Sequence, residues 1–296
     1  MKDHQLKALI QVAESGSIRA AARAMNLSQS ALTKALRELE DEVGAELLMR
    51  SYKGIEFTPA GQALRTHARL AQATLDKARE EIRLLRGGSG ARIAIALTPL
   101  VAATILPPVL TQFRRNQPDA ILSLEEGLLT HVLPRLLEGR LDFAVALANS
   151  RDLPHEVTFE PLTEVHAVPT GRLGHPLANA QTWAELKDAS WVLNLTDGSL
   201  GSHLLRWLTA HRIDAPTNVV HCASFTLMLE LMRRTDCIGF GPTDLLSDTL
   251  FAAGLQPFSV TPVPEPMALG ILRLRSIPLS SSARVLAALF TRHLQK

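Results

Sequence analysis

The chain is poor in cysteine and in aromatic residues, and neither sign of charge is in large excess. It has two cysteines in 296 residues, aromatic residues make up 4% of it, and the formal net charge is +2. Two cysteines form neither a disulfide framework nor a metal site, so we expect Cys222 and Cys237 to be ordinary core thiols. A redox role would need exposure and a lowered thiol pKa, and the sequence leaves that question open. Composition therefore excludes a disulfide-rich secreted protein and does not by itself indicate a nucleic-acid-binding one.

A membrane span is also missing from the sequence. The longest uncharged run, from Ile93 to Phe113, is broken by Pro99, Pro107 and Pro108. Its first third is better explained as a buried strand. The N-terminal residues lead directly into a helical pattern without a signal peptide. We therefore expect a cytoplasmic protein with no membrane partner.

The common sequence motifs of enzymes are absent as well. The chain has no Gly-x-Ser-x-Gly turn, His-Glu-x-x-His motif, phosphate-binding loop or paired Cys-x-x-Cys. Its ten histidines are scattered. We expect no catalytic residue, no metal ligand and no cofactor, so binding is the favoured class of function.

The most informative pattern near the N-terminus is that of a helix-turn-helix. Ser17 and Ser28 can cap two successive helices and stand eleven positions apart. The residues 25–27 between the helices are few enough for a tight turn, and alanines on the first helix let the second cross it closely. An upstream amphipathic pattern completes a three-helix core with Leu6, Leu9, Ile10 and Ala13.

The second helix of the pair has an apolar face and a polar face. Apolar residues recur at helical spacing at Leu32, Ala35, Leu36, Leu39 and Val43. Amide, hydroxyl and cationic groups on the opposite face suit base edges and phosphates in a DNA groove. We expect DNA contacts from Ser28, Gln29, Ser30, Thr33, Lys34 and Arg37. The acidic residues near the end of this helix would have to point away from phosphates; they are Glu38, Glu40, Asp41 and Glu42.

A predicted wing follows. Residues 47–50 and 55–58 flank a glycine-containing turn, which is typical of two antiparallel strands. Arg50 and Lys53 would then lie near the DNA backbone.

Here the residues resemble a known family. The run Ala21-Ala22-x-x-Met25-x-Leu27-Ser28-Gln29-Ser30-Ala31-Leu32-Thr33, followed by Leu39-Glu40-x-x-Val43-Gly44 and Leu47-Leu48-x-Arg50, resembles the N-terminal domain of the LysR-type transcriptional regulators. Thr33 stands where the family more often has serine, and Leu48 where it usually has phenylalanine. Both departures keep the role of the residue. The resemblance implies transcription regulation, DNA binding and contact with the transcription machinery.

A long helix is predicted after the wing, beginning at Thr58-Pro59. Its apolar residues alternate steps of four and three for three heptads, as in a coiled coil, at Leu64, Ala68, Ala71, Leu75, Ala78, Ile82 and Leu85. We expect this stripe to pair with the same stripe of a second copy and so to form a homodimer. The resemblance also implies this dimer, and it further implies that two dimers form a homotetramer. Packing of the stripe on the downstream domain of its own chain is the alternative. A two-fold dimer predicts a roughly palindromic DNA site, and residues 87–90 supply a flexible joint.

Strand and helix patterns alternate beyond the joint, which predicts parallel α/β sheets. These patterns include a strand over residues 164–168 and a helix over residues 244–252. We expect two lobes, with the chain crossing near residue 161 and returning near 265. The segments 106–113, 139–142 and 175–177 resemble the effector-binding domain of the same family, so the resemblance covers essentially the whole chain. The predicted fold class is α/β: a winged helix-turn-helix (1–58), a linker helix and hinge (59–90) and a two-lobed effector domain like a periplasmic binding protein (91–296). Lobe I is 91–160 and 265–296, and lobe II is 161–264.

Ligands of open α/β sheets bind at the carboxyl ends of strands, near helix N-termini. The first candidate effector residues stand at positions that line the inducer pocket in the family: Thr98, Pro99, Leu100, Thr196, Asp197, Gly198 and Ser199. Phe225, at the opening of another helix, is a third-rank candidate. Each could instead be only a cap or turn residue. Helix dipoles favour an anion such as an organic acid, whereas Asp197 would repel one and favours a neutral or hydroxyl-bearing ligand.

The function predicted is that of a sequence-specific transcriptional regulator switched by a small molecule bound between two lobes. The alternative is a solute-binding or enzymatic α/β protein that uses its helix-turn-helix only for assembly. The effector, the target genes and the direction of regulation stay open.

Overall fold

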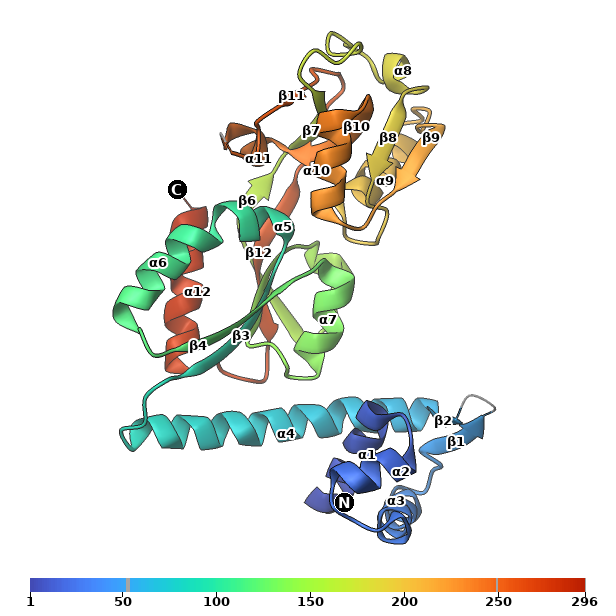
Figure 1. Cartoon of the computed structure of the whole chain (residues 1–296), viewed down its shortest axis with the longest axis vertical. Helices are drawn as coiled ribbons and strands as arrows, with labels where there is room; N and C mark the ends of the chain where they lie inside the picture. The colour runs from blue at the N-terminus through green and yellow to red at the C-terminus, as the bar shows by residue number, and fades with distance from the viewer. Residues whose placement is uncertain (52–53, 249, 296) are drawn as a thin grey trace. The chain divides into compact units, whose positions relative to one another are not determined.

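The computed structural model describes residues 1–51, 54–248 and 250–295. The chain forms two compact units, one of Met1–Arg83 with Leu137–Arg140 and one of Leu84–Leu136 with Leu141–Lys296. We call them the N-terminal unit and the C-terminal unit. Figure 1 labels most of the helices and strands of both.

The N-terminal unit contains a helix-turn-helix, a two-stranded wing and a long helix. Its elements are α1 (Asp3–Ser15), α2 (Ile18–Ala24), α3 (Gln29–Val43), β1 (Leu48–Ser51), β2 (Gly54–Phe57) and α4 (Pro59–Leu85). The predicted caps are present, since Ser17 Oγ accepts a hydrogen bond from Ala20 N (3.2 Å) and Ser28 Oγ accepts one from Ala31 N (3.1 Å). The three helices share a buried core of Ala8, Leu9, Val12, Ala21, Ala22, Leu32, Leu36 and Leu39. Of the residues predicted on the first helix, Leu9 belongs to this core, whereas Leu6 is only partly buried against it and Ala13 is half-buried outside it.

The wing strands are antiparallel, with Leu48 opposite Phe57. They lead directly into α4, which begins where the Thr58-Pro59 pair predicts. Thr58 Oγ1 accepts a hydrogen bond from Gly61 N (3.0 Å) and donates one to Glu46 O (2.6 Å). The backbone of Gly61 lies against the carbonyl of Leu47 with no space for a Cβ, so this turn of α4 is fixed to the strand entrance.

The apolar stripe of α4 becomes exposed toward the end of the helix. Ala68 is buried, whereas Leu75 is 52% exposed, Ile82 is 56% exposed and Leu85 is 82% exposed. These large apolar side chains lack a covering surface within the chain as described.

The C-terminal unit has two lobes, each built on one five-stranded sheet. Lobe I contains β3 (Arg92–Leu97), α5 (Pro99–Thr104), α6 (Leu106–Asn116), β4 (Ile121–Glu126), α7 (Leu129–Leu137), β5 (Phe143–Leu147), the 3-10 turn η1 (Ser150–Asp152), β6 (Val157–Val165), β12 (Met267–Leu274) and α12 (Ser281–Leu294). Lobe II contains β7 (Ala167–Arg172), α8 (Trp183–Leu186), β8 (Ser190–Leu193), α9 (Leu200–Ala210), β9 (Asn218–His221), α10 (Phe225–Arg234), β10 (Cys237–Pro242), α11 (Thr243–Ser247) and β11 (Leu255–Pro257).

Both sheets are mixed, which corrects the prediction of purely parallel sheets. Their strand orders are β4-β3-β5-β12-β6 in lobe I and β11-β7-β10-β8-β9 in lobe II. The strands β3, β4 and β5 run parallel, and so do β8, β9 and β10. In contrast, β12 is antiparallel to β5 and β6, and β7 is antiparallel to β10 and β11. The antiparallel strands lie at the two points where the chain changes lobe: β6 is followed by β7 at the first, and β11 by β12 at the second. A parallel pair needs a crossover connection, usually a helix, and the described chain has no such helix at either point.

The lobe crossing occurs slightly later than residue 161. The strand β6 stays in the sheet of lobe I up to Val165, and β7 starts in lobe II at Ala167. The single strand predicted over residues 164–168 is therefore wrong, since it spans the end of β6 and the start of β7. The return strand β12 pairs with β6 along its length, from Met267 opposite Val165 to Leu274 opposite Val157. The two connections between the lobes thus lie side by side.

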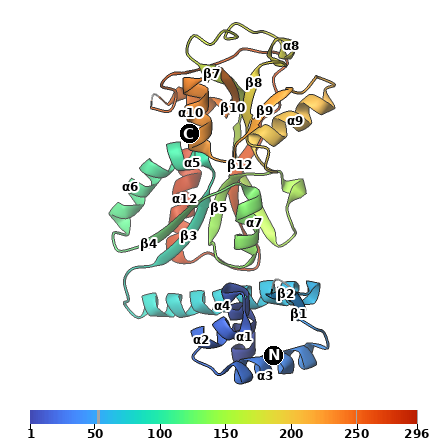
Figure 2. The ribbon, with the colours of Figure 1, turned by 45° about the vertical axis from the view of Figure 1, so that its right-hand side comes forward.

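Helices cover both faces of each sheet (Figure 2). In lobe I, α6 and α12 pack on one face, where Phe113 and Phe290 meet Ile93, Ile95 and Leu97. In lobe II the side chains of β8 alternate: Trp191 and Leu193 join the core under α9, and Val192 joins Leu229 and Met232 under α10.

Two smaller expectations, on the length of one helix and on the two cysteines, can also be compared with the structure. The helix predicted over residues 244–252 ends at Ser247, because Asp248 Oδ1 accepts hydrogen bonds from the amides of Leu250 (2.9 Å) and Phe251 (3.2 Å) and forms a local turn. Cys222 and Cys237 are half-buried free thiols.

Candidate functional site

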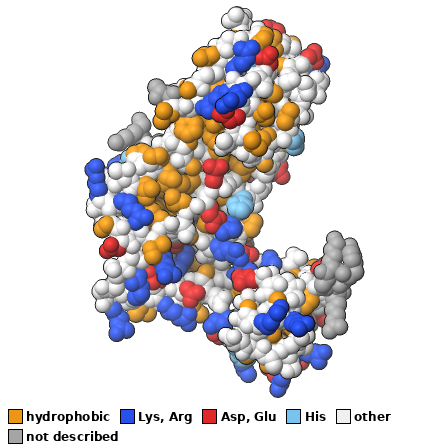
Figure 3. Space-filling view, in the orientation of Figure 1, with side chains coloured by type: hydrophobic (Ala, Val, Ile, Leu, Met, Phe, Trp, Pro, Cys, Tyr) orange, Lys and Arg blue, Asp and Glu red, His pale blue; other side chains and the backbone are white. Residues whose placement is uncertain are grey.

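The polar face predicted for the second helix of the helix-turn-helix exists on α3. Gln29, Ser30, Thr33, Lys34 and Arg37 line one shallow surface groove. All but the half-buried Thr33 are exposed. The structure therefore brings five of the eight predicted DNA-contacting residues onto one face. In Figure 3, basic and acidic side chains are intermingled on the visible face of the N-terminal unit, in keeping with its modest charge.

These side chains differ in whether their polar groups already form hydrogen bonds within the protein. Ser28 Oγ serves as the helix cap and lies 3.0 Å from Ser30 Oγ, and Thr33 Oγ1 donates to the carbonyl of Gln29 (2.8 Å). Among the described residues, the side chains of Gln29 and Arg37 make no hydrogen bond within the protein. They are the groups on this face best able to reach a partner.

The acidic residues of α3 do not all point away from this face. Glu40 does, since its Oε1 accepts hydrogen bonds from the amides of Leu47 (2.8 Å) and Leu48 (3.2 Å). Glu38 and Asp41 instead line the same groove as Lys34 and Arg37. The expectation for these two was wrong because residues four apart share a helix face; Glu38 Oε1 lies 3.8 Å from Lys34 Nζ.

The two wing candidates cannot be placed in the same way. Arg50 belongs to β1, opposite Ile55, but its side chain lies outside the described part of the structure. Lys53 lies outside the described residues altogether.

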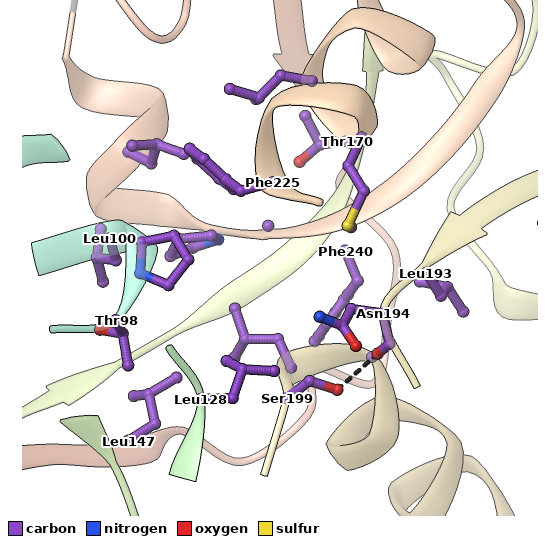
Figure 4. A pocket seen from close by; sticks show the side chains of 18 of the residues that line it. Thr98, Leu100, Leu128, Leu147, Thr170, Leu193, Asn194, Ser199, Phe225 and Phe240 are labelled. Carbon is purple, nitrogen blue, oxygen red and sulfur yellow. Dashed lines mark hydrogen bonds between the residues drawn. The ribbon is translucent and has the colours of Figure 1, made fainter. Parts of the chain in front are cut away.

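A cavity of about 210 Å³ lies between the lobes of the C-terminal unit. Five of the eight candidate effector residues line it: Thr98, Pro99, Leu100, Ser199 and Phe225. Thr98 and Leu100 come from the region after β3 in lobe I, and Ser199 lies before α9 in lobe II, so residues from both lobes meet (Figure 4). Thr196, Asp197 and Gly198 are not among the lining residues; Asp197 and Gly198 line a separate, more open groove with His203 and Arg206.

Many lining residues were not predicted. Leu147, Leu193 and Phe240 belong to β5, β8 and β10, at or near the carboxyl ends of these strands. The strand-end rule could have identified them. Met228, Leu229 and Met232 follow Phe225 at helical spacing on α10 and face the same cavity; an apolar helix face is ordinarily core, so the sequence offered no distinctive signal for them.

The two hydroxyl residues of the cavity have different roles. Ser199 Oγ accepts a hydrogen bond from Ser202 N (3.1 Å) and donates one to Asn194 O (2.5 Å), so it is a satisfied cap of α9. Thr98 precedes α5, but its side chain makes no capping hydrogen bond. Thr98 is only 3% exposed, and its Oγ1 has no hydrogen-bond partner among the described residues.

The basic residues nearest the cavity along α10 are engaged elsewhere. Arg234 and Arg233 donate hydrogen bonds to Glu230 at 2.6 Å and 3.1 Å, and these bonds lower the pKa of that carboxyl, Arg234 having the larger effect. Arg233 also donates to the carbonyl of Phe251 (2.9 Å). Both guanidinium groups are therefore already paired within lobe II, and neither residue lines the cavity.

Two further features of the described residues bear on other classes of function. Among the described residues, no three His, Cys, Asp or Glu side chains gather in a way that could hold a metal ion. None of the described helices combines the length and the apolar character needed to cross a membrane.

Comparison with known proteins gives consistent results for both units. The family described as "Bacterial regulatory helix-turn-helix protein, lysR family" matches residues 4–62, and the one described as "LysR substrate binding domain" matches residues 86–295. The regulator TdcA of Escherichia coli K12 is 28% identical over 264 residues, covering 89% of this chain and 83% of that protein.

Solved structures show the same fold. ArgP from Mycobacterium tuberculosis has a TM-score of 0.73 at 22% identity, covering 98% of this chain and 96% of that one. Full-length CbnR in complex with its target DNA has a TM-score of 0.66 at 20% identity, covering 100% and 99%. Because the two family matches together span most of the sequence, this chain belongs to the LysR family of DNA-binding transcriptional regulators, whose second domain binds an effector.

Proposed function

We propose that this protein binds a specific double-stranded DNA site through the polar face of α3 and that a small molecule in the cavity of the C-terminal unit switches its activity. The observation that carries the first part is the exposed face shared by Gln29, Lys34 and Arg37. An amide and two cations on an exposed helix face suit base edges and phosphates. A helix-turn-helix used only for assembly gives no reason for these groups to stay exposed together. A DNA complex of CbnR, a relative by fold, supports this use of the domain.

We further propose a homodimer formed through α4. Leu75 and Ile82 lie seven residues apart in the predicted stripe and are each more than half exposed. Pairing with the same stripe of a second copy would remove both from water. Two-fold symmetry would place two recognition helices on a roughly palindromic site, and pairing of two dimers on adjacent sites is the tetramer that we expect from the family.

The switch requires that the ligand bind two states of the protein with different affinity. The cavity lies between the lobes, whose two connecting segments are adjacent. Ligand binding that changes the angle of one lobe against the other would alter the spacing of the DNA-binding domains in the assembly, and with it the bend of the DNA. The transcription machinery would read that difference.

A gel-shift experiment with the segment upstream of the protein's own gene tests the first part. We expect specific retardation of this DNA and much weaker retardation of an unrelated fragment, with an affinity that falls as salt rises. Equal retardation of both fragments, or none at low salt, would contradict the proposal.

A further inference from the structure

The wall of the cavity is almost wholly apolar and carries no positive charge. Among its described lining residues there is no lysine, arginine or histidine. The only ionisable side chain among these described lining residues is Glu126, which is exposed. The apolar wall consists of Leu100, Leu128, Leu147, Leu193, Phe225, Met228, Leu229, Met232, Phe240, Leu245, Leu246 and Leu255 with smaller residues between them.

The helix dipoles at this cavity would favour an anion, but Ser199 and Ser224 already cap α9 and α10, and α5 is only six residues long. The side chains of the wall are unfavourable for an anion. A carboxylate that leaves water needs a compensating cation or several hydrogen-bond donors. The cations Arg233 and Arg234 are held by Glu230, and Arg172 donates to Asp236 at 2.8 Å. The carboxylate of Glu126 would add repulsion.

The cavity nevertheless offers two uncharged polar groups, one on each side. Thr98 lines it, is buried, and has an Oγ1 without a partner among the described residues. A buried polar atom without a partner is unusual in a folded protein, and it costs stability unless a ligand or water satisfies it. Across the cavity, Asn194 uses its Oδ1 to accept a hydrogen bond from Thr196 N (2.9 Å), so a ligand meets its amide nitrogen, a donor. Figure 4 shows Thr98 and Asn194 on opposite sides of the cavity.

The volume limits the size of the ligand. An apolar cavity of about 150 Å³ holds benzene, so one of about 210 Å³ suits a molecule of about eight to ten non-hydrogen atoms.

We propose that the cavity binds an uncharged molecule of this size, with an apolar body and one carbonyl or hydroxyl oxygen that pairs with Thr98, and that it discriminates against carboxylates. This inference rests on the proposed role of the cavity as the effector site. It resolves the choice between an organic acid and a neutral ligand in favour of the neutral one.

Ligand-observed NMR titration of the full-length protein with three probes of nearly equal size, acetophenone, benzamide and benzoate, tests the ligand class. We expect saturable binding of the two uncharged probes and a dissociation constant for benzoate that is at least roughly tenfold higher, because its charge is not compensated. In Thr98→Val the uncharged probes should bind about fivefold more weakly. Thr98→Ser should restore the binding. The control Thr130→Val, in the separate open groove, should leave it unchanged.

Three results would overturn the inference: benzoate binding as tightly as the uncharged probes, no saturable binding of any probe, or equal losses in Thr98→Val and Thr130→Val. The gel shift on the same preparation separates this inference from the proposed function. Probe binding with the expected selectivity but no effect of the probes on DNA retardation would support the ligand class and contradict the role of the cavity as a switch.

Discussion

At the scale of single residues, Thr98 and Ser199 show that the same chemistry before a helix can have two roles. Ser199 satisfies an amide of α9 and a neighbouring carbonyl, whereas the hydroxyl of Thr98 satisfies nothing within the described protein. The sequence alone gives both the character of helix caps. Only the packed structure shows which hydroxyl is used as a cap and which is not.

Ser199→Ala and Thr98→Val should therefore differ in stability. We expect Ser199→Ala to lower the free energy of unfolding by about 1 kcal/mol, the usual value of a lost cap. Thr98→Val removes no hydrogen bond and keeps the side-chain volume, so it should leave stability unchanged or slightly raised. Denaturant titration of the two variants measures this. An equal loss in both would mean that Thr98 also supports the fold.

The same pair of variants tests the switch. Both should lose most of the effector response, Thr98→Val through the ligand contact and Ser199→Ala through the displaced start of α9, and both should retain DNA binding. Effector-dependent gel shifts provide the measurement. Simultaneous loss of DNA binding would point to a folding defect.

On α3, the cation and the amide should contribute to DNA binding in different ways. Lys34→Ala should weaken binding to all sequences and make its salt dependence shallower, because one phosphate contact is lost. Gln29→Ala should cost about 1 to 3 kcal/mol of discrimination at particular base pairs. Binding curves at several salt concentrations, with matched and mutated sites, distinguish the two effects.

Lys7→Ala is the control, since Lys7 lies on α1 and pairs with Asp3 at 2.7 Å. If Lys34→Ala left both affinity and salt slope at the values of this control, the assigned helix face would be wrong. Glu38→Gln should strengthen binding slightly, because the carboxylate competes with phosphate for Lys34 at an exposed position.

At the scale of elements, the start of α4 depends on a glycine. Alanine in a helix is normally more stable than glycine by about 1 kcal/mol. At Gly61, however, a Cβ would overlap the backbone carbonyl of Leu47, and backbone at that point cannot move without disturbing the wing. Overpacking of this kind lowers the free energy of unfolding by about 1 to 3 kcal/mol. We therefore expect Gly61→Ala to lower the melting temperature by several degrees.

Gln62→Ala, at the adjacent exposed position of α4, is the matched control and should keep the melting temperature of the wild type. A stabilised Gly61→Ala variant would show that helix propensity exceeds the steric cost at this contact.

The outer half of α4 should determine the oligomeric state. Leu75→Lys would place a charge in the middle of the proposed dimer stripe, so we expect a shift from dimer to monomer in sedimentation velocity and weaker binding to a palindromic site. Asp76→Lys introduces the same side chain one position away, about 100° around the helix axis from Leu75, where Asp76 pairs with Arg79. A dimer that survives Leu75→Lys would exclude α4 as the main interface.

At the scale of the whole molecule, the C-terminal unit should fold without the N-terminal one. Its first strand is already fixed at its beginning, where the buried Ala91 accepts a hydrogen bond from Ile121 N (2.8 Å). We expect the fragment 91–296 to unfold cooperatively and to bind the uncharged probes with the affinity of the full chain, but not to retard DNA. Circular dichroism melting and the NMR titration check this, and a fragment that fails to fold would contradict the proposed boundary.

The sequence by itself determined the helix-turn-helix, the start of α4 and most strands and helices of the lobes. Their signals are local: hydroxyl caps, proline at the first turn, and apolar residues three or four apart act within a few residues of each other. The polar face of α3 could be predicted for the same reason. The prediction that Glu38 and Asp41 point away from this face failed because residues three or four apart on a helix share one face.

The tertiary structure decided what depends on distant segments. The pairing of β6 with β12 joins residues about a hundred positions apart, and it makes the sheet of lobe I mixed where alternation alone predicted a parallel one. The cavity combines Thr98, Leu193 and Met228 from separate elements. The cations Arg172, Arg233 and Arg234 are paired with carboxylates of the same lobe and are not among the described lining residues. No local pattern contains that information, because long-range packing sets it.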